Sequence, residues 1–384
     1  MITRRGDYPE VPKERRNGKL YAWIGITGKC NLDCIYCYAN SSCVADQHLE
    51  LNEIEEILTD LAEVGSAKVM ISGGEPCLYD DLPSVLKLTR DYGHQSVLVT
   101  NGTLFNDSLI RLLSELGIQV QVSIDSINWD EYHRSRGSTF SSIVIRNIDR
   151  LLERSIELSL SCTLTIHNVR GIKETILFAL SKGIEFMHIA PMVPVGRGQA
   201  NQSSTISNWY EILSQLYELQ KEHYLQLGID LIEALVYPLA VSSHEGFYCN
   251  SMGGRAIEID ADGTVYYCGY LRDFPPFILG NIRKTRLVKI LDKANNDHDF
   301  PAITVDKIPC CRTCRFRIMC CGGCRVDAFV TSRGNILARP SICAGMQQIC
   351  SDIVSDFKEG RLDAYIEFLR LRNELTGDCV VKYM

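Results

Sequence analysis

Three cysteines lie close together near the start of the chain, at Cys30, Cys34 and Cys37, with the spacing C-x3-C-x2-C. Three thiols in one short loop cannot complete a structural zinc site, which requires four protein ligands. A [4Fe–4S] cubane held by three cysteines instead leaves one iron open to an outside ligand. The spacing therefore favours a cubane over a zinc loop that takes its fourth ligand from elsewhere.

A second group of cysteines lies in the last third of the chain. Cys249 and Cys268 flank an alternating segment, 256–267, in which Asp262-Gly263 is a hairpin turn signal. Two cubanes need up to eight thiolates, whereas a zinc ribbon would explain only four of these cysteines. The other five follow as C-x2-C-x5-C-x3-C and one more, at Cys311, Cys314, Cys320, Cys324 and Cys343.

The composition fits a globular chain of about two domains, with 384 residues and 17 cysteines. The first 19 residues are polar and basic, so we expect no secretory signal, and metal ligation explains the cysteines better than disulfides. The net charge of −7 gives no reason to expect a nucleic acid partner. No apolar run approaches the length of a membrane span. We therefore expect a cytoplasmic protein.

Strand-like and amphipathic helical runs alternate from residue 21 to about residue 235, which predicts a parallel sheet with helices outside. Six such units would make an α/β fold, a partial (β/α)6 TIM-like barrel, whose ligands bind at the carboxyl ends of the strands. The predicted strands are 22–27, 68–72, 96–100, 119–124, 157–164 and 184–190. The predicted helices are 51–64, 82–92, 108–116, 141–152 and 172–181.

Polar residues follow the second and third predicted strands. After the second strand come Gly73 and Gly74, which let the backbone approach a ligand closely, and Glu75, which can accept hydrogen bonds from an ammonium group. The alternative is a tight turn that leads into a helix. Asn101 follows the third strand within an ordinary Asn-Gly turn.

The fourth and sixth predicted strands also end in residues of interest. Ser123 and Asp125 are two apart on a strand, so their side chains point the same way and would suit ribose hydroxyls. Arg136 follows soon after, with a guanidinium fork that suits a carboxylate. Val193 lies in a Pro-rich and Gly-Arg segment, and His188 beside it reads as a satisfied core histidine rather than a catalyst.

The cysteine loop followed by Gly-Gly-Glu-Pro resembles the signature of the radical S-adenosylmethionine (radical SAM) superfamily. The resemblance implies that Cys30, Cys34 and Cys37 hold a [4Fe–4S] cluster whose open iron binds SAM. It also implies the fold predicted above. The cofactor-binding residues that we expect are Tyr36 beside the adenine, Gly73, Gly74 and Glu75 at the methionyl amino group, Asn101, Ser123 and Asp125 at the strand ends, Arg136 at the SAM carboxylate, and Val193 by its backbone at the adenine.

The later cysteines resemble the SPASM extension of radical SAM proteins, which carries two auxiliary [4Fe–4S] clusters. By that resemblance, Cys249, Cys268 and Cys324 bind the first auxiliary cluster, which leaves it one ligand short. Some relatives supply a further cysteine soon after the first, and this chain has none between 250 and 267. The second cluster would take Cys311, Cys314, Cys320 and Cys343, while the adjacent Cys310 and Cys321 are out of register.

These assignments divide the chain into an N-terminal segment, 1–20, a radical SAM barrel, 21–235, a SPASM domain, 236–350, and a C-terminal helical segment, 351–384. The resemblance implies reductive cleavage of SAM to a 5′-deoxyadenosyl radical that abstracts hydrogen from a substrate, with electrons from a flavodoxin or ferredoxin. The leading substrate is a side chain of a ribosomally made precursor peptide, which is oxidised or crosslinked. The usual N-terminal recognition domain is missing from the sequence, so a separate peptide-recognition protein is a possible partner.

Three alternatives stay open. An anaerobic sulfatase-maturating enzyme is similar in length, but such enzymes place an aspartate directly after the hairpin cysteine, where this chain has Gly269 and reaches Asp273 only later. A small-molecule dehydrogenase or decarboxylase is the second. An iron–sulfur electron carrier is the third, against which the SAM-binding elements argue. The general base is not identified by the sequence.

Overall fold

The computed structural model describes the chain apart from residues 1–19, 139, 242–248, 252, 297–302 and 377–384. Its described strands form one sheet in the order β10-β9-β8-β1-β2-β3-β4-β5-β6-β7. These strands are β1 (Leu20–Thr27), β2 (Ser66–Gly73), β3 (Gln95–Thr100), β4 (Gln119–Ser123), β5 (Leu158–Leu164), β6 (Phe186–Pro191), β7 (Gly228–Ile229), β8 (Ala256–Ile259), β9 (Thr264–Tyr266) and β10 (Ile278–Asn281).

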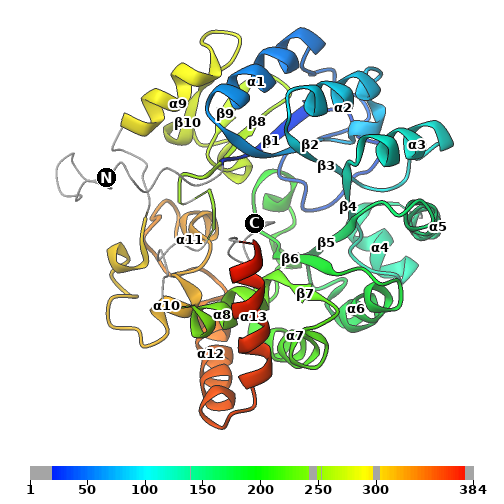
Figure 1. Ribbon diagram of the computed structural model, residues 1–384. Coiled ribbons are helices and arrows are strands. Elements are labelled where there is room, and N and C mark those ends of the chain that lie inside the picture. The colour runs from blue at the N-terminus through cyan, green and yellow to red at the C-terminus, as the bar shows by residue number, and fades with distance from the viewer. Residues whose placement is uncertain (1–19, 139, 242–248, 252, 297–302, 377–384) are drawn as a thin grey trace.

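The six predicted strand–helix units are present, and the predicted α/β barrel architecture is confirmed. Strands β1 to β7 pair in parallel, and Figure 1 shows their helices ranged around the outside in chain order. The sequence reading missed α4 and the two-residue β7. The helices are α1 (Leu51–Glu63), α2 (Leu82–Asp91), α3 (Asp107–Leu116), α4 (Trp129–Arg136), α5 (Ser141–Leu152), α6 (Ile172–Ser181) and α7 (Trp209–His223).

Local sequence signals explain where these helices begin and end. Helix α3 starts at Asn106, whose side-chain oxygen accepts a hydrogen bond from the Leu109 amide at 2.8 Å, and stops at Gly117 in the left-handed region. Helix α4 uses the same devices, with Asn128 at its start and Gly137 at its end. The caps fix the positions of the loops that carry functional side chains.

The register of the parallel strands places polar side chains in one row. Ser123 of β4 is paired with Ser161 of β5, which is paired with His188 of β6. Paired residues of parallel strands point to the same face, because side chains alternate along each strand. The row lies toward the carboxyl ends of the strands, on the face opposite the helices. His188 and Ala190 are two residues apart on β6, so their side chains lie on this same face.

The hairpin flanked by Cys249 and Cys268 belongs to the same sheet as the barrel. Strand β8 pairs in parallel with β1, and β9 and β10 follow in antiparallel order. The turn between β8 and β9 contains Gly263 with φ +82°, as the Asp-Gly signal predicts. The sheet therefore continues from the barrel into the cysteine-rich half without a break.

The second half is otherwise helical, with α8 (Asp230–Ala240), α9 (Leu287–Asn296), α10 (Arg317–Cys320), α11 (Arg325–Thr331), α12 (Cys343–Lys358) and α13 (Asp363–Thr376). Helix α8 runs through the boundary that we placed at 235/236, and α12 through the one at 350/351, so neither coincides with a break in secondary structure. Among the described helices, none is both long enough and apolar enough to cross a bilayer.

The ends of β1 and β2 lie very close together. The Gly74 amide donates to the Thr27 carbonyl at 2.7 Å, and the Glu75 amide donates to the Lys29 carbonyl at 2.8 Å. A Cβ atom on Gly73 would overlap the Thr27 carbonyl oxygen, and one on Gly74 would overlap that of Lys29. We expected these glycines to let the backbone approach a ligand. The structure shows that they let it approach the loop that carries Cys30.

This packing predicts a large cost for Gly73→Ala. The substitution adds the strain of positive φ, about 1–2 kcal/mol, to a backbone overlap of about 1–3 kcal/mol. Gly93→Ala is the matched control, because Gly93 also has a positive φ but has nothing within 4 Å of an added Cβ. We expect urea denaturation to show a clearly larger loss of unfolding free energy for Gly73→Ala. Equal losses would contradict the close-approach argument.

Candidate functional site

One cavity of about 350 Å³ opens at the carboxyl ends of the parallel strands. That volume lies at the lower end of the range for ligand pockets. Side chains of β1 to β6, the cysteine loop and the start of the second half all line it. Of the residues that we predicted from the sequence, eleven line this cavity, and they are Cys30, Cys34, Tyr36, Cys37, Gly73, Gly74, Asn101, Ser123, Arg136, Val193 and Cys268.

The three cysteines of the loop face this cavity together. Burial raises the pKa of Cys30 to about 11 and that of Cys34 to about 12. Buried thiols of this kind ionise when a metal centre binds them, because the metal stabilises the thiolate. The donor set therefore fits an iron–sulfur cluster, and Arg197 steadies the loop by donating to the Cys34 carbonyl at 2.9 Å and the Ser41 carbonyl at 2.7 Å.

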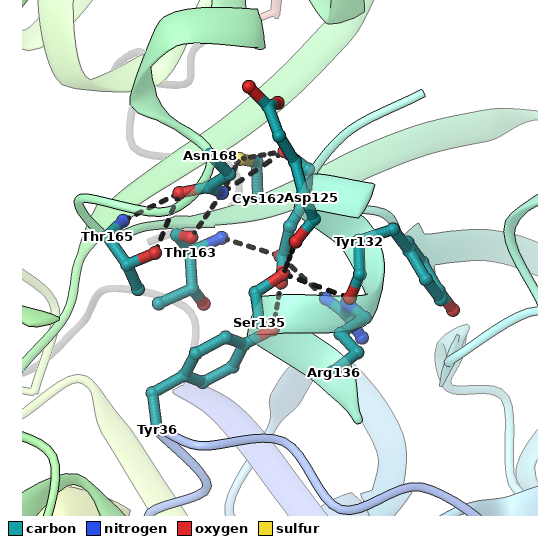
Figure 2. A network of polar contacts seen from close by, with 10 residues as sticks. Tyr36, Asp125, Tyr132, Ser135, Arg136, Cys162, Thr163, Thr165 and Asn168 are labelled. Carbon is teal, nitrogen blue, oxygen red and sulfur yellow. Dashed lines mark hydrogen bonds and ion pairs between the residues drawn. The ribbon is translucent and has the colours of Figure 1, made fainter. Parts of the chain in front are cut away.

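A buried ion pair lies beside the loop. Arg136 Nη2 donates to Asp125 Oδ1 at 2.8 Å, and the Asp125 side chain is fully buried. Figure 2 shows Tyr36 and Arg136 converging on this carboxylate, which also accepts from the Thr163 amide at 3.1 Å. Asp125 does not line the cavity. Its contact with a ribose stays a prediction, and the role that the structure gives it is to hold Arg136 and Tyr36.

Arg136 has one donor left over. Its Nε atom is buried and has no hydrogen-bond partner among the described residues, while its side chain borders the cavity. Burial opposes its charge, but the anionic Asp125 and the neighbouring Tyr36 and Cys34 keep the pKa of Arg136 well above its ordinary value. A permanently charged guanidinium with a buried free donor fits a carboxylate ligand.

Glu75 is also fully buried and lies behind the cavity rather than on its wall. Its carboxylate accepts from Thr100 Oγ1 at 2.7 Å, the Asn101 amide at 2.7 Å and the Cys77 amide at 3.1 Å. Burial raises the pKa of Glu75, and these three donors oppose that rise. A direct contact between Glu75 and an ammonium group stays a prediction.

Asn101 and Val193 connect the strand ends to the loops around them. The Asn101 side chain donates to Asn31 Oδ1 of the cysteine loop at 2.8 Å and accepts from the Thr103 amide at 2.9 Å. The Val193 carbonyl accepts from the Val195 amide at 2.8 Å, and its side chain is buried. Ser123 borders the cavity at the end of β4.

The cysteines of the second half gather into two groups. Burial raises the pKa of Cys268, and the nearby Cys249 and Cys324 raise it further. Burial also raises the pKa of Cys324 to about 12. Cys268 also lines the main cavity, together with Gly269 and Tyr270. This first group of three thiols therefore reaches the same space as the cysteine loop through Cys268.

The second group contains one thiol more than we expected. A small pocket is lined by Cys310 in addition to the four predicted cysteines, and Cys310 Sγ lies 3.9 Å from Cys311 Sγ. Sequence spacing alone set Cys310 aside as out of register. The chain turns sharply at this pocket, with positive φ at Gly322 and Gly323. The pocket's five thiols are Cys310, Cys311, Cys314, Cys320 and Cys343.

His188 is a further cavity residue that we did not include among the candidates. We interpreted it as a satisfied core histidine, but it lines the main cavity, and its Nδ1 is hydrogen-bonded to the buried carboxylate of Asp230. The two-residue alternation of β6 was a signal that could have placed it inward. Its partner could not have been found, because Asp230 lies 42 positions away at the start of α8.

Comparisons with known proteins agree with this architecture. Residues 24–179 match the model of the radical SAM superfamily, and residues 249–315 match the SPASM model, an iron–sulfur cluster-binding domain. The AdoMet-dependent heme synthase of Methanosarcina barkeri is 27% identical over 85% of this chain and 96% of that enzyme. The cysteine-type anaerobic sulfatase-maturating enzyme of Clostridium perfringens is 24% identical over 77% of this chain and 86% of that enzyme.

Solved structures share the fold. The structure of anSMEcpe with bound AdoMet and the Cp18Cys peptide has a TM-score of 0.74 at 20% identity and covers 92% of this chain and 100% of its own. Streptococcus suis SuiB bound to S-adenosylmethionine has a TM-score of 0.67 at 20% identity, and the match covers 85% of this chain and 77% of the SuiB chain. The two family-model matches thus identify a radical SAM domain and a SPASM domain in this chain, and these domains imply a SAM-binding [4Fe–4S] cluster and auxiliary clusters.

The buried pair predicts a strong effect of Asp125→Asn. The change leaves the Arg136 charge buried without its counter-ion, which costs about 3–5 kcal/mol. Asp107→Asn is the control, because the Asp107–Arg150 pair is largely exposed and is worth less than about 1 kcal/mol. Urea denaturation of the two variants measures the difference. If Asp125→Asn lost no more unfolding free energy than the control, the Asp125–Arg136 pair would not be what stabilises the site.

Proposed function

We propose that this radical SAM/SPASM protein abstracts a hydrogen atom from a peptide side chain and oxidises or crosslinks it. When bound, SAM and its reduced cluster supply a 5′-deoxyadenosyl radical for that abstraction. The residues of the chain then have separate tasks. They hold the cofactors, place the side chain and exclude water from the reaction.

Three sets of cysteines would hold the clusters. Cys30, Cys34 and Cys37 would take the SAM-binding cluster, and the free Nε donor of Arg136 would bind the SAM carboxylate. Tyr36, Gly73, Gly74, Asn101, Ser123 and Val193 would form the wall around the rest of SAM. The auxiliary clusters would take the first group, Cys249, Cys268 and Cys324, and four thiols from the second.

The observation that carries the proposal is that one cavity is bordered by both the cysteine loop and Cys268. A substrate in this cavity would lie between the site of hydrogen abstraction and an auxiliary cluster. An oxidation that removes two electrons needs an acceptor for the second, and an adjacent cluster is suited to that task. A protein that only carried electrons would need neither the free Arg136 donor nor the cavity.

The size of the cavity favours a side chain over a macrocycle. About 350 Å³ must contain SAM as well as the reacting group. A peptide can insert one side chain while its backbone stays at the mouth. The similarity to heme synthases, which spans nearly the whole of the Methanosarcina enzyme, supports a second candidate, a small-molecule decarboxylase or dehydrogenase.

One residue of the chain does not match the sulfatase-maturating alternative. The residue after the hairpin cysteine is Gly269, and a Cβ there would overlap the carboxylate of Glu258. The Glu258 side chain would have to move to admit an aspartate at this position. Glu258 itself borders the cavity and accepts from Tyr38 Oη at 2.9 Å.

The remaining partners are proposed on the same basis. An external flavodoxin or ferredoxin would reduce the first cluster, and a separate recognition protein would deliver the precursor peptide. Structures of anSMEcpe and of SuiB contain bound peptides, which supports a peptide partner here. A reducing cytoplasm would suit oxygen-sensitive clusters.

The first test is anaerobic reconstitution with iron and sulfide, followed by a SAM-cleavage assay with dithionite. Three cubanes predict about twelve irons per chain and formation of 5′-deoxyadenosine. Cysteine- and serine-containing peptides and an iron porphyrin are then compared as substrates by mass spectrometry. A peptide that loses two hydrogens supports the proposal, turnover of the porphyrin alone would replace it with the second candidate, and zinc in place of iron would remove both.

A cysteine series tests the cluster assignment. Cys320→Ser removes a thiol at the centre of the second group, so we expect a loss of about four irons per chain. Cys162→Ser is the control, because Cys162 is fully buried in β5 away from both groups and should keep all its iron. Comparing Cys310→Ser with Cys311→Ser shows which of the two neighbours is a ligand. Full iron content in Cys320→Ser would contradict the assignment.

A further inference from the structure

We propose that the His188–Asp230 pair is a proton-transfer site in the main cavity, in which His188 Nε2 accepts a proton from a substrate S–H, O–H or N–H group. This inference rests on the proposed function, since it supplies the general base that the reaction of a side chain would need. In the step, the bond between hydrogen and the heteroatom breaks, and its electron pair stays on the heteroatom. The proton forms a new bond to Nε2, which leaves an imidazolium beside Asp230.

The geometry fixes which ring nitrogen can act. Nδ1 is hydrogen-bonded to Asp230 Oδ2, while Asp230 Oδ1 accepts from the Ile189 amide at 2.9 Å and the Leu231 amide at 2.7 Å. The carboxylate is therefore held by the backbone on one side and holds the imidazole on the other. Nδ1 then carries the proton in the neutral ring, and Nε2 keeps its lone pair. Among the described residues, Nε2 has no hydrogen-bond partner.

The position fits a substrate-facing role. His188 lines the cavity with about a quarter of its side chain exposed, whereas Asp230 is almost completely buried. Register places His188 two strands from Ser123, roughly 10 Å at about 4.8 Å per strand. A group held between the predicted SAM site and β6 would reach Nε2.

The surroundings favour proton acceptance by the imidazole. Burial opposes a charged imidazole, but the Asp230 carboxylate raises the pKa of His188 above its ordinary value. The other charged groups on the cavity wall are Lys68 of β2, Arg136 of α4, Arg197 and Glu258 of β8. Such pairing of a cavity histidine with a buried carboxylate is the arrangement that general acid–base catalysis uses.

The tautomer gives a test that needs no substrate. The reconstituted holoenzyme is treated anaerobically with diethylpyrocarbonate, which acylates an imidazole nitrogen that has a free lone pair, and each histidine is followed by peptide mass spectrometry. We expect His188 to react, with exposed His133 as the internal reference. In Asp230→Asn, the two backbone amides keep the oxygen, so the amide NH₂ faces Nδ1 and moves the ring proton to Nε2. Acylation of His188 should then fall several-fold.

Glu233→Gln is the matched control. Glu233 is another buried carboxylate of α8, but it pairs with Arg372 and not with His188, so His188 should react in this variant as in the unmodified protein. An unreactive His188 in the unmodified protein would overturn the proposal. So would equal acylation in Asp230→Asn.

Turnover provides the second readout. With a peptide that the substrate comparison identifies, His188→Gln should lower the product formed per 5′-deoxyadenosine by about a hundredfold. An unchanged ratio, or a loss found in Glu258→Gln and absent in His188→Gln, would assign the base elsewhere and overturn the proposal. If no peptide is turned over, the proposed function fails, while the acylation pattern still decides whether the pair presents a free Nε2 to the cavity.

Discussion

The ion pair between Asp125 and Arg136 is the interaction on which the cavity wall depends. Both side chains are buried, and removing such charges from water is expensive unless each finds its partner. The pair joins the end of β4 to the last residue of α4, and the carbonyls of Ser135 and Arg136 accept from amides of the cysteine loop. Through this contact the loop, the helix and the sheet hold one another in place, so the position of the cysteines depends on a salt bridge that is remote in sequence.

The same device recurs around the barrel. Glu75, Asp125 and Asp230 are buried carboxylates at or near strand ends, and each accepts a hydrogen bond from a backbone amide of a neighbouring segment. Backbone groups at the ends of strands lose their ladder partners and must be satisfied in another way. All three carboxylates meet that need, and Asp125 and Asp230 also bind a cavity side chain, Arg136 and His188 respectively. The architecture of the barrel and the chemistry of its mouth are therefore supplied by the same residues.

Much of this was readable from the sequence, for reasons that are local. The strands and helices of the barrel follow from apolar periodicity, and α5 and α6 have the predicted bounds because their apolar faces are regular. The cysteine positions followed from spacing. What the sequence could not indicate were pairings between distant residues, such as His188 with Asp230, or the packing of Gly73 against Thr27. We expected Glu75 and Asp125 to contact a ligand, but both lie behind the cavity. The sequence pattern shows where a strand ends, but it does not show in which direction a side chain beyond that end points.

The pairing of β8 with β1 affects how the chain can acquire this structure. β1 leaves the ribosome well before β8, which is one of its two neighbours in the sheet and lies more than 200 residues later in the chain. Until β8 is made, one edge of β1 exposes unpaired amides and carbonyls, which invite association with other chains. Completion of the sheet is thus delayed until most of the protein has been synthesised. The cysteine-rich half supplies the strands that cover this side of β1, and a fragment that ended before residue 256 would leave that edge open.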